Sequence, residues 1–104
     1  ITSGENMAIH AAANIAMAVE NFKDRGYAQL GGLILNRRNV KNEEEKVAEL
    51  AEDIHSKVIG TLSRSELVTD AEEQQKTVME AYPNSPMAEE YRVLAKQIRK
   101  LCGI

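Results

Sequence analysis

The chain has 104 residues and a formal net charge of −3, with 43% hydrophobic and 28% charged residues. This is the composition of one small globular domain and not of a disordered chain. The slightly acidic balance argues against a surface built mainly for nucleic acid. No apolar run approaches the roughly 20 residues that span a bilayer. We therefore expect no nucleic-acid partner and no membrane partner.

The beginning of the chain and its cysteine content bear on where the protein works. The first residues, ITSGENMAIH, have neither the basic region nor the apolar region of a signal peptide. The single cysteine, Cys102, allows no disulfide within the chain and fits a reducing compartment. We expect a cytoplasmic location. Because the chain opens at Ile1 without an initiator Met, we also expect a piece of a longer protein.

An alanine-rich stretch predicts a first helix, with Ser3 as its N-cap and Gly26 as its left-handed stop. Apolar residues recur there at steps of three and four, which marks one face of the helix. The residues of this face are Met7, Ala11, Ile15, Ala18 and Phe22. We interpret the methionines of the chain as core filling.

Two short apolar runs, residues 30–36 and 58–62, predict buried strands. Residues 42–55 between them predict a helix whose apolar stripe is Val47, Leu50, Ala51 and Ile54. This is a βαβ unit, so the strands should be parallel and the crossover right-handed. Gly31 and Gly32 would lie inside the first strand, where they permit close packing.

The remainder of the chain predicts further helices. Ser65 caps a short helix from Glu66, Thr77 caps another turn, and Ser85-Pro86 begins a final amphipathic helix. The order α-β-α-β-α-α is an α/β fold. Because two strands make a poor sheet for such apolar segments, we expect a fragment of a larger parallel sheet.

Two acidic runs, residues 43–45 and 72–73, invite a metal-site or general-acid interpretation. We interpret both as solvated helix faces, the first of them in a first turn where the helix dipole favours negative charge. His10 and His55 are isolated, and no second ligand has suitable spacing. The sequence therefore predicts no metal site and no catalytic residue.

Polar residues at the ends of the two strands point to a ligand. Asn36 ends the first strand and Ser63-Arg64 follow the second, so both lie at the carboxyl edge of the sheet, where ligands bind. An Asn amide can read a purine edge, and Arg can stack on a base or pair with a phosphate. The alternative is that Asn36 and Arg64 only cap loops, and spacing does not decide between the two.

The sequence also resembles the nitrogenase iron protein family, in order and almost without gaps, just after the family's switch II region. The segments that carry the resemblance are Ser3-Gly4-Glu5, Met7-Ala8, residues 12–15, residues 30–34 with Asn36, Thr77-Val78, Tyr82-Pro83, Glu90-Tyr91-Arg92 and Leu94-Ala95. Members are homodimeric P-loop ATPases that hold one 4Fe–4S cluster per dimer. They pass electrons to a reductase partner when ATP is bound and hydrolysed.

The resemblance implies that residues 1–104 are a single domain, the C-terminal portion of such an ATPase with a partial P-loop NTPase-type three-layer fold. In the family, the P-loop, both switches and the cluster cysteines lie upstream of this segment. ATP with Mg²⁺ and the 4Fe–4S cluster would then belong to the parent homodimer, and we expect none bound to this chain. The parent's partner would be a nitrogenase-like reductase catalytic component.

Residue by residue, Asn36 falls at the family's adenine-reading asparagine. Residues 63–66 fall where the nitrogenase branch has Pro-Arg-Asp-Asn, an adenine-side loop, so that Arg64 matches and Ser65 does not. Tyr91 matches a family tyrosine near the base, whereas Met87 replaces a nucleotide-contacting Gln. The resemblance thus implies cofactor-binding roles for Asn36, Arg64, Ser65 and Tyr91 in a divergent paralogue.

Two other functions stay open. A regulatory or carrier P-loop ATPase of the related partitioning and metal-carrier group would bind nucleotide without a redox role. A free-standing α/β interaction module would bind no ligand. Two spaced cysteines upstream of Ile1 would favour the reductase. Under each function this chain alone should not hydrolyse ATP, because it has no phosphate cradle and no Mg²⁺ site.

Overall fold

The computed structural model describes residues 1–23, 25–26 and 28–103. The elements in this part of the chain are α1 (Asn6–Lys23), β1 (Leu33–Asn36), α2 (Glu43–Asp53), β2 (Val58–Leu62), α3 (Glu66–Glu73), α4 (Val78–Ala81) and α5 (Pro86–Cys102). β1 and β2 pair in parallel, with Asn36 opposite Leu62. The expected βαβ unit with flanking helices is therefore confirmed, and α4 is the turn predicted after Thr77.

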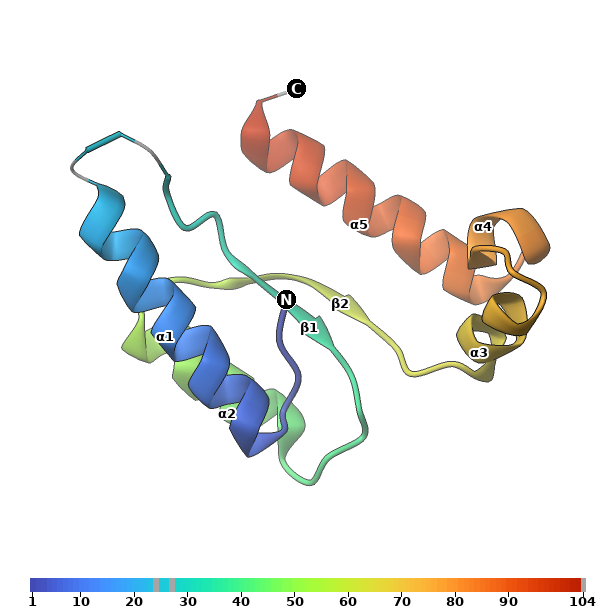
Figure 1. Cartoon of the computed structure of the whole chain (residues 1–104), viewed down its shortest axis with the longest axis horizontal. Helices are drawn as coiled ribbons and strands as arrows, with labels where there is room; N and C mark the ends of the chain where they lie inside the picture. The colour runs from blue at the N-terminus through green and yellow to red at the C-terminus, as the bar shows by residue number, and fades with distance from the viewer. Residues whose placement is uncertain (24, 27, 104) are drawn as a thin grey trace.

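Helices cover both faces of the small sheet (Figure 1). Leu33 and Leu35 of β1 point into a core shared with α1 and α2, while the intervening Ile34 packs into a second core beneath α5. Gly60 of β2 lets α5 approach closely, because a Cβ at this position would lie 2.4 Å from Cδ1 of Leu94. The result is a three-layer α/β/α arrangement, as expected for a partial P-loop NTPase-type fold.

The sheet has a further participant that the sequence did not indicate. The segment around Thr2 runs parallel to β1 on the side away from β2 and forms a bridge with Leu35. The Thr2 N–H donates to the Ile34 carbonyl at 2.9 Å, and the Asn36 N–H donates to the Thr2 carbonyl at 2.7 Å. β1 is therefore hydrogen-bonded along both of its edges.

The prediction for the start of α1 was wrong. Ser3 is buried beside the sheet, and α1 begins only at Asn6. The Ser3 hydroxyl accepts a hydrogen bond from the Glu5 N–H at 3.3 Å and so shapes the turn before the helix. At the other end, Gly26 has the expected left-handed conformation, with φ of 73°.

The apolar face predicted for α1 is not the face that the chain buries. Met7 and Ile15 are 82% and 62% exposed. The side that packs toward α2 and the sheet carries Ile9, Ala12, Ala13 and Ala16. Of the methionines interpreted as core filling, only Met87 is buried.

The glycine pair precedes β1 and does not lie inside it, because the strand begins at Leu33. Gly32 has φ of 154°, and a Cβ there would lie 2.6 Å from Cγ2 of Ile59. The predicted role of close packing is therefore confirmed for Gly32. The prediction that the pair lies inside the strand was wrong.

The predicted helix starts after β2 are confirmed. Ser65 accepts from the Leu67 N–H, Thr77 forms a capping box with Glu80, and Ser85 accepts from the Ala88 N–H. Within the described residues, no helix has the length and apolar character needed to cross a membrane.

Candidate functional site

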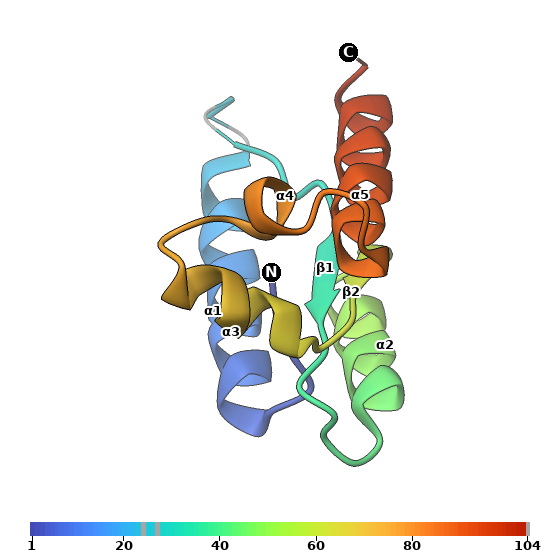
Figure 2. The same cartoon turned by 90° about the vertical axis from the view of Figure 1, so that its right-hand side faces the viewer.

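The carboxyl ends of the strands form one edge of the molecule, where β1 leads into a loop of residues 37–42 and β2 leads into residues 63–65. Figure 2 looks onto this end, with α3 and α4 in front of the sheet. Asn36, the last residue of β1, is exposed and lies opposite Leu62. The predicted placement of Asn36 beside the loop after β2 is therefore correct.

Hydrogen bonds tie the two loops together. The Arg37 N–H donates to the Leu62 carbonyl at 2.9 Å, and Arg64 Nη1 donates to the Arg38 carbonyl at 3.3 Å. The Ser63 N–H donates to Oε1 of Glu90 at 2.8 Å, which anchors the second loop to α5. The structure thus brings Asn36 and Arg64 to the same edge and holds both loops by their backbones.

Ser65 has a structural role that is visible in the hydrogen bonds. Its hydroxyl oxygen accepts from the Leu67 N–H at 3.2 Å at the start of α3. A hydroxyl still offers its own hydrogen when it accepts a bond. Ser65 can therefore cap α3 with its oxygen and, at the same time, donate its hydroxyl hydrogen to a ligand at this edge.

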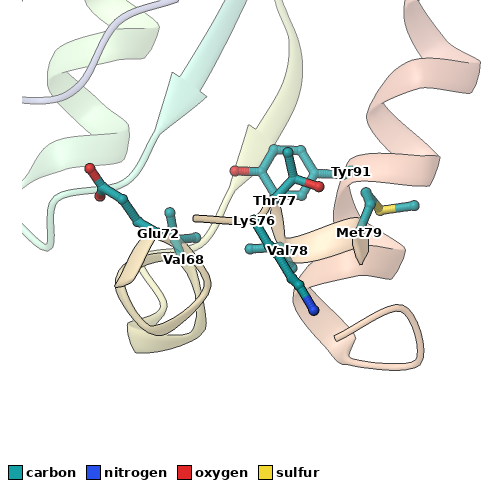
Figure 3. Close-up of a pocket in the computed structure, with 7 residues that line it drawn as sticks. All are labelled: Val68, Glu72, Lys76, Thr77, Val78, Met79 and Tyr91. Atoms are coloured by element: carbon teal, nitrogen blue, oxygen red, sulfur yellow. The ribbon is translucent and has the colours of Figure 1, made fainter. Parts of the chain in front are cut away.

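Tyr91 lies in a different setting from the other predicted residues. It is half-buried on α5, packs against the core beneath that helix, and lines a pocket of about 520 Å³ between α3, α4 and α5. Figure 3 shows this pocket, whose lining residues are Val68, Glu72, Lys76, Thr77, Val78, Met79 and Tyr91. The structure therefore joins Tyr91 to the C-terminal helices, while Asn36 and Arg64 do not line this pocket.

Met87 lies on α5 as Tyr91 does, and it is buried in the core against which Tyr91 packs. It is 4% exposed, and the same core includes Leu62 of β2, Ala71 of α3 and Val78 of α4. A side chain so enclosed offers little surface to a ligand.

Glu43 contradicts the interpretation of residues 43–45 as a solvated helix face. This first residue of α2 is 5% exposed. Its carboxylate accepts from the N–H groups of Gly4 at 2.8 Å, Arg38 at 3.1 Å and Asn39 at 3.2 Å. Glu44 and Glu45 are exposed, as predicted.

The surroundings of Glu43 favour its charged form. Burial alone raises the pKa of a carboxyl, but the hydrogen bonds from the Gly4, Arg38 and Asn39 N–H groups and the charge of Arg37 outweigh burial. The pKa of Glu43 is therefore lower than its ordinary value. The side chain is a buried anion whose hydrogen bonds come from the backbone of two separate segments.

Sequence reasoning missed Glu43 and Glu90, the two carboxylates that hold the loops. Each accepts from a backbone N–H far away in the chain, Gly4 for Glu43 and Ser63 for Glu90. Such contacts leave no periodic signal. A faint indication was available for Glu43, since it is the first acidic residue after a polar loop and directly precedes a helical apolar stripe.

Metal-binding groups do not gather in the described residues, where no cluster of three or more His, Cys, Asp and Glu side chains has suitable geometry. The chain's one cysteine, Cys102, is exposed near the end of α5. Iron–sulfur clusters are usually held by four thiolates. The residues of this chain therefore do not fit a cluster-binding role.

A model of the family described as "4Fe-4S iron sulfur cluster binding proteins, NifH/frxC family" matches residues 1–102. The chain belongs to this family. Membership confirms the resemblance seen in the sequence and assigns the chain to a family of iron–sulfur-binding P-loop ATPases.

Proposed function

We propose that this chain forms the adenine side of the nucleotide site in an ATP-dependent iron–sulfur reductase of the nitrogenase iron protein type. The main support for this proposal is that Asn36 and the loop of Arg64 lie together at the carboxyl edge of a parallel sheet. Open parallel sheets bind ligands at this edge. The whole protein would be a cytoplasmic homodimer with P-loop and cluster cysteines upstream of residue 1, and a nitrogenase-like catalytic component would receive its electrons.

The proposed chemistry assigns separate tasks to the edge residues. The Asn36 amide offers both donors and an acceptor and would pair with the adenine edge. Arg64 would stack its planar guanidinium on the base, since its hydrogen bond to the Arg38 carbonyl uses one of the five guanidinium donors. Ser65 would donate its hydroxyl hydrogen, and Tyr91 would enclose the ligand from α5. These residues bind and orient the base, and phosphoryl transfer would belong to the upstream part.

The test is nucleotide binding by the Asn36→Ala variant in the full-length protein. We expect ATP and ADP to lose affinity to similar extents, by about 1–3 kcal/mol, because Asn36 would contact the base that both share. Asn14→Ala, which truncates an exposed amide on α1 far from this edge in the sequence, is the matched control and should bind as the wild type does. Loss of ATP affinity with ADP affinity retained would indicate a γ-phosphate contact and overturn the assignment.

A further inference from the structure

Two backbone segments converge on the buried carboxylate of Glu43. One is the turn of residues 3–5, which follows the Thr2 segment of the sheet and donates through Gly4. The other is the loop after β1, which donates through Arg38 and Asn39. Each segment leaves the sheet at its carboxyl edge. One side chain therefore joins the two chain segments on either side of the Thr2–Asn36 hydrogen bond.

The approach of Gly4 to Glu43 is too close for any other residue. A Cβ at position 4 would lie 2.5 Å from Cγ of Glu43 and 2.8 Å from its Cα. Because the second of these atoms is backbone, the overlap cannot be relieved by a side-chain rotation. Gly4 and Glu43 thus form a matched pair.

The carboxylate also places the loop that carries the arginines. Arg38 donates its backbone N–H to Glu43, offers its carbonyl to Arg64, and lies with its Nε 3.5 Å from Oε1 of Glu5. Arg37 forms an ion pair with Glu44. Glu43 therefore fixes the backbone of Arg38, and the Arg38 carbonyl in turn holds the Arg64 side chain. Asn36 lies two residues before Arg38, so the same contact limits its position.

We propose that Glu43 is a positioning residue for the nucleotide site, which clamps residues 37–39 to the turn at Gly4 and so sets the places of Asn36 and Arg64. This rests on the proposed function, because the base is the ligand being positioned. Glu43 itself touches no ligand. Buried hydrogen-bonded carboxylates are costly to disturb, since each freed N–H is then left without a partner.

The experiment compares the wild-type chain with Glu43→Gln and with Glu45→Gln, a matched change in the same helical turn at an exposed position. Amide hydrogen exchange by NMR reports the clamp. We expect exchange at Gly4, Arg38 and Asn39 to quicken by about tenfold or more in Glu43→Gln, because the neutral amide accepts these bonds less strongly. Glu45→Gln should exchange as the wild type does. Unchanged exchange in Glu43→Gln would overturn the clamp.

The second readout is ADP binding by the full-length protein, measured for the wild type, for Glu43→Gln and for Glu45→Gln. We expect Glu43→Gln to weaken ADP binding by about threefold to tenfold, the range expected for a positioning contact. Wild-type affinity should also fall on acidification as Glu43 protonates, whereas the affinity of Glu43→Gln should stay low and change less with pH. Other charged groups on the turn, the loop and the first turn of α2 are Glu5, Arg37, Arg38, Lys41, Glu44, Glu45 and Lys46.

The outcomes separate the two proposals. If the full-length wild type gives no saturable response to ADP, the proposed function fails, and the positioning role falls with it. If the wild type binds ADP but Glu43→Gln binds it equally well despite faster exchange, Glu43 serves the fold alone and only the positioning role is overturned. Gly4→Ala disturbs the same contact at its other partner, so it should also weaken ADP binding.

Discussion

Helices α1 and α2 lie on the same face of the sheet, yet they use their apolar residues differently. The predicted stripe of α2 is the one that the chain buries, with Val47 at 0% and Leu50 at 4% exposure. The predicted stripe of α1 faces outward, with Ile15 at 62% exposure, while small residues such as Ala16 meet the core. Periodicity therefore identifies a helix, but the element that packs against it decides which of two possible stripes is buried.

The largest effect should come from the buried stripe. Leu50→Ala should lower the free energy of unfolding by about 2–5 kcal/mol, because it removes buried methyl groups and leaves a cavity in the core shared with β1. Ile15→Ala should change it by less than about 0.5 kcal/mol, the usual range for surface substitutions. Denaturant unfolding of both variants is the measurement. Equal losses would show that the outer face of α1 is packed in solution.

The buried Glu43 and the exposed Glu45 lie in the same turn of α2 and should respond differently to acid. The pKa of Glu43 is lower in the folded chain than its ordinary value of 4.5. Its contribution to stability is therefore fully present above pH 4.5 and is lost as the pH falls through the lower folded-state pKa. One hydrogen bond to a charged group is worth about 1.5–3 kcal/mol, and Glu43 accepts from the N–H groups of Gly4, Arg38 and Asn39, so the loss should be measurable.

Unfolding free energies measured from neutral to acidic pH provide the check. Glu43→Gln should be less stable at neutral pH and should lose less stability on acidification than the wild type. Glu45→Gln, whose side chain is exposed, should follow the wild-type curve. A Glu43→Gln curve parallel to that of the wild type would show that another group governs the acid response.

Local patterns carried much of the fold prediction. The caps at Ser65, Thr77 and Ser85 could be predicted because each hydroxyl accepts a hydrogen bond from a backbone N–H two or three residues later in the chain. The βαβ unit was readable because short apolar runs flank an amphipathic helix. The sequence did not predict a non-local contact, the pairing of Thr2 with Leu35 of β1. These residues lie 33 positions apart, and no sequence pattern near Thr2 indicates the pairing.

The candidate site divides in the same way. Asn36 and Arg64 could be placed together because the carboxyl ends of parallel strands meet at one edge. Their supports could not be foreseen, since Glu43 and Glu90 act on backbone groups 39 and 27 residues away. Nucleotide binding by Asn36, Arg64, Ser65 and Tyr91 stays a prediction that only ligand experiments can test.

The smallest expected change in monomer stability comes from substituting the outer face of α1. The effect of such a substitution on self-association tests whether this face is an interaction surface. We expect the chain to self-associate at micromolar concentration, with a second copy covering the outer face of α1. The exposed Met7 and Ile15 favour such a contact, because they form part of an apolar stripe on this helix. Extended apolar patches on small proteins commonly mark interaction surfaces.

Light scattering of three proteins tests this expectation. Ile15→Lys should reduce association while changing monomer stability by less than about 0.5 kcal/mol, because the lysine ammonium would have to be desolvated in the interface and is hydrated in the monomer. Val93→Lys places the same charge at an exposed apolar position on α5, 44% accessible, and should associate as the wild type does. A well-dispersed wild-type monomer would contradict the expectation. Equal loss in both variants would show that net charge, and not the face of α1, controls association.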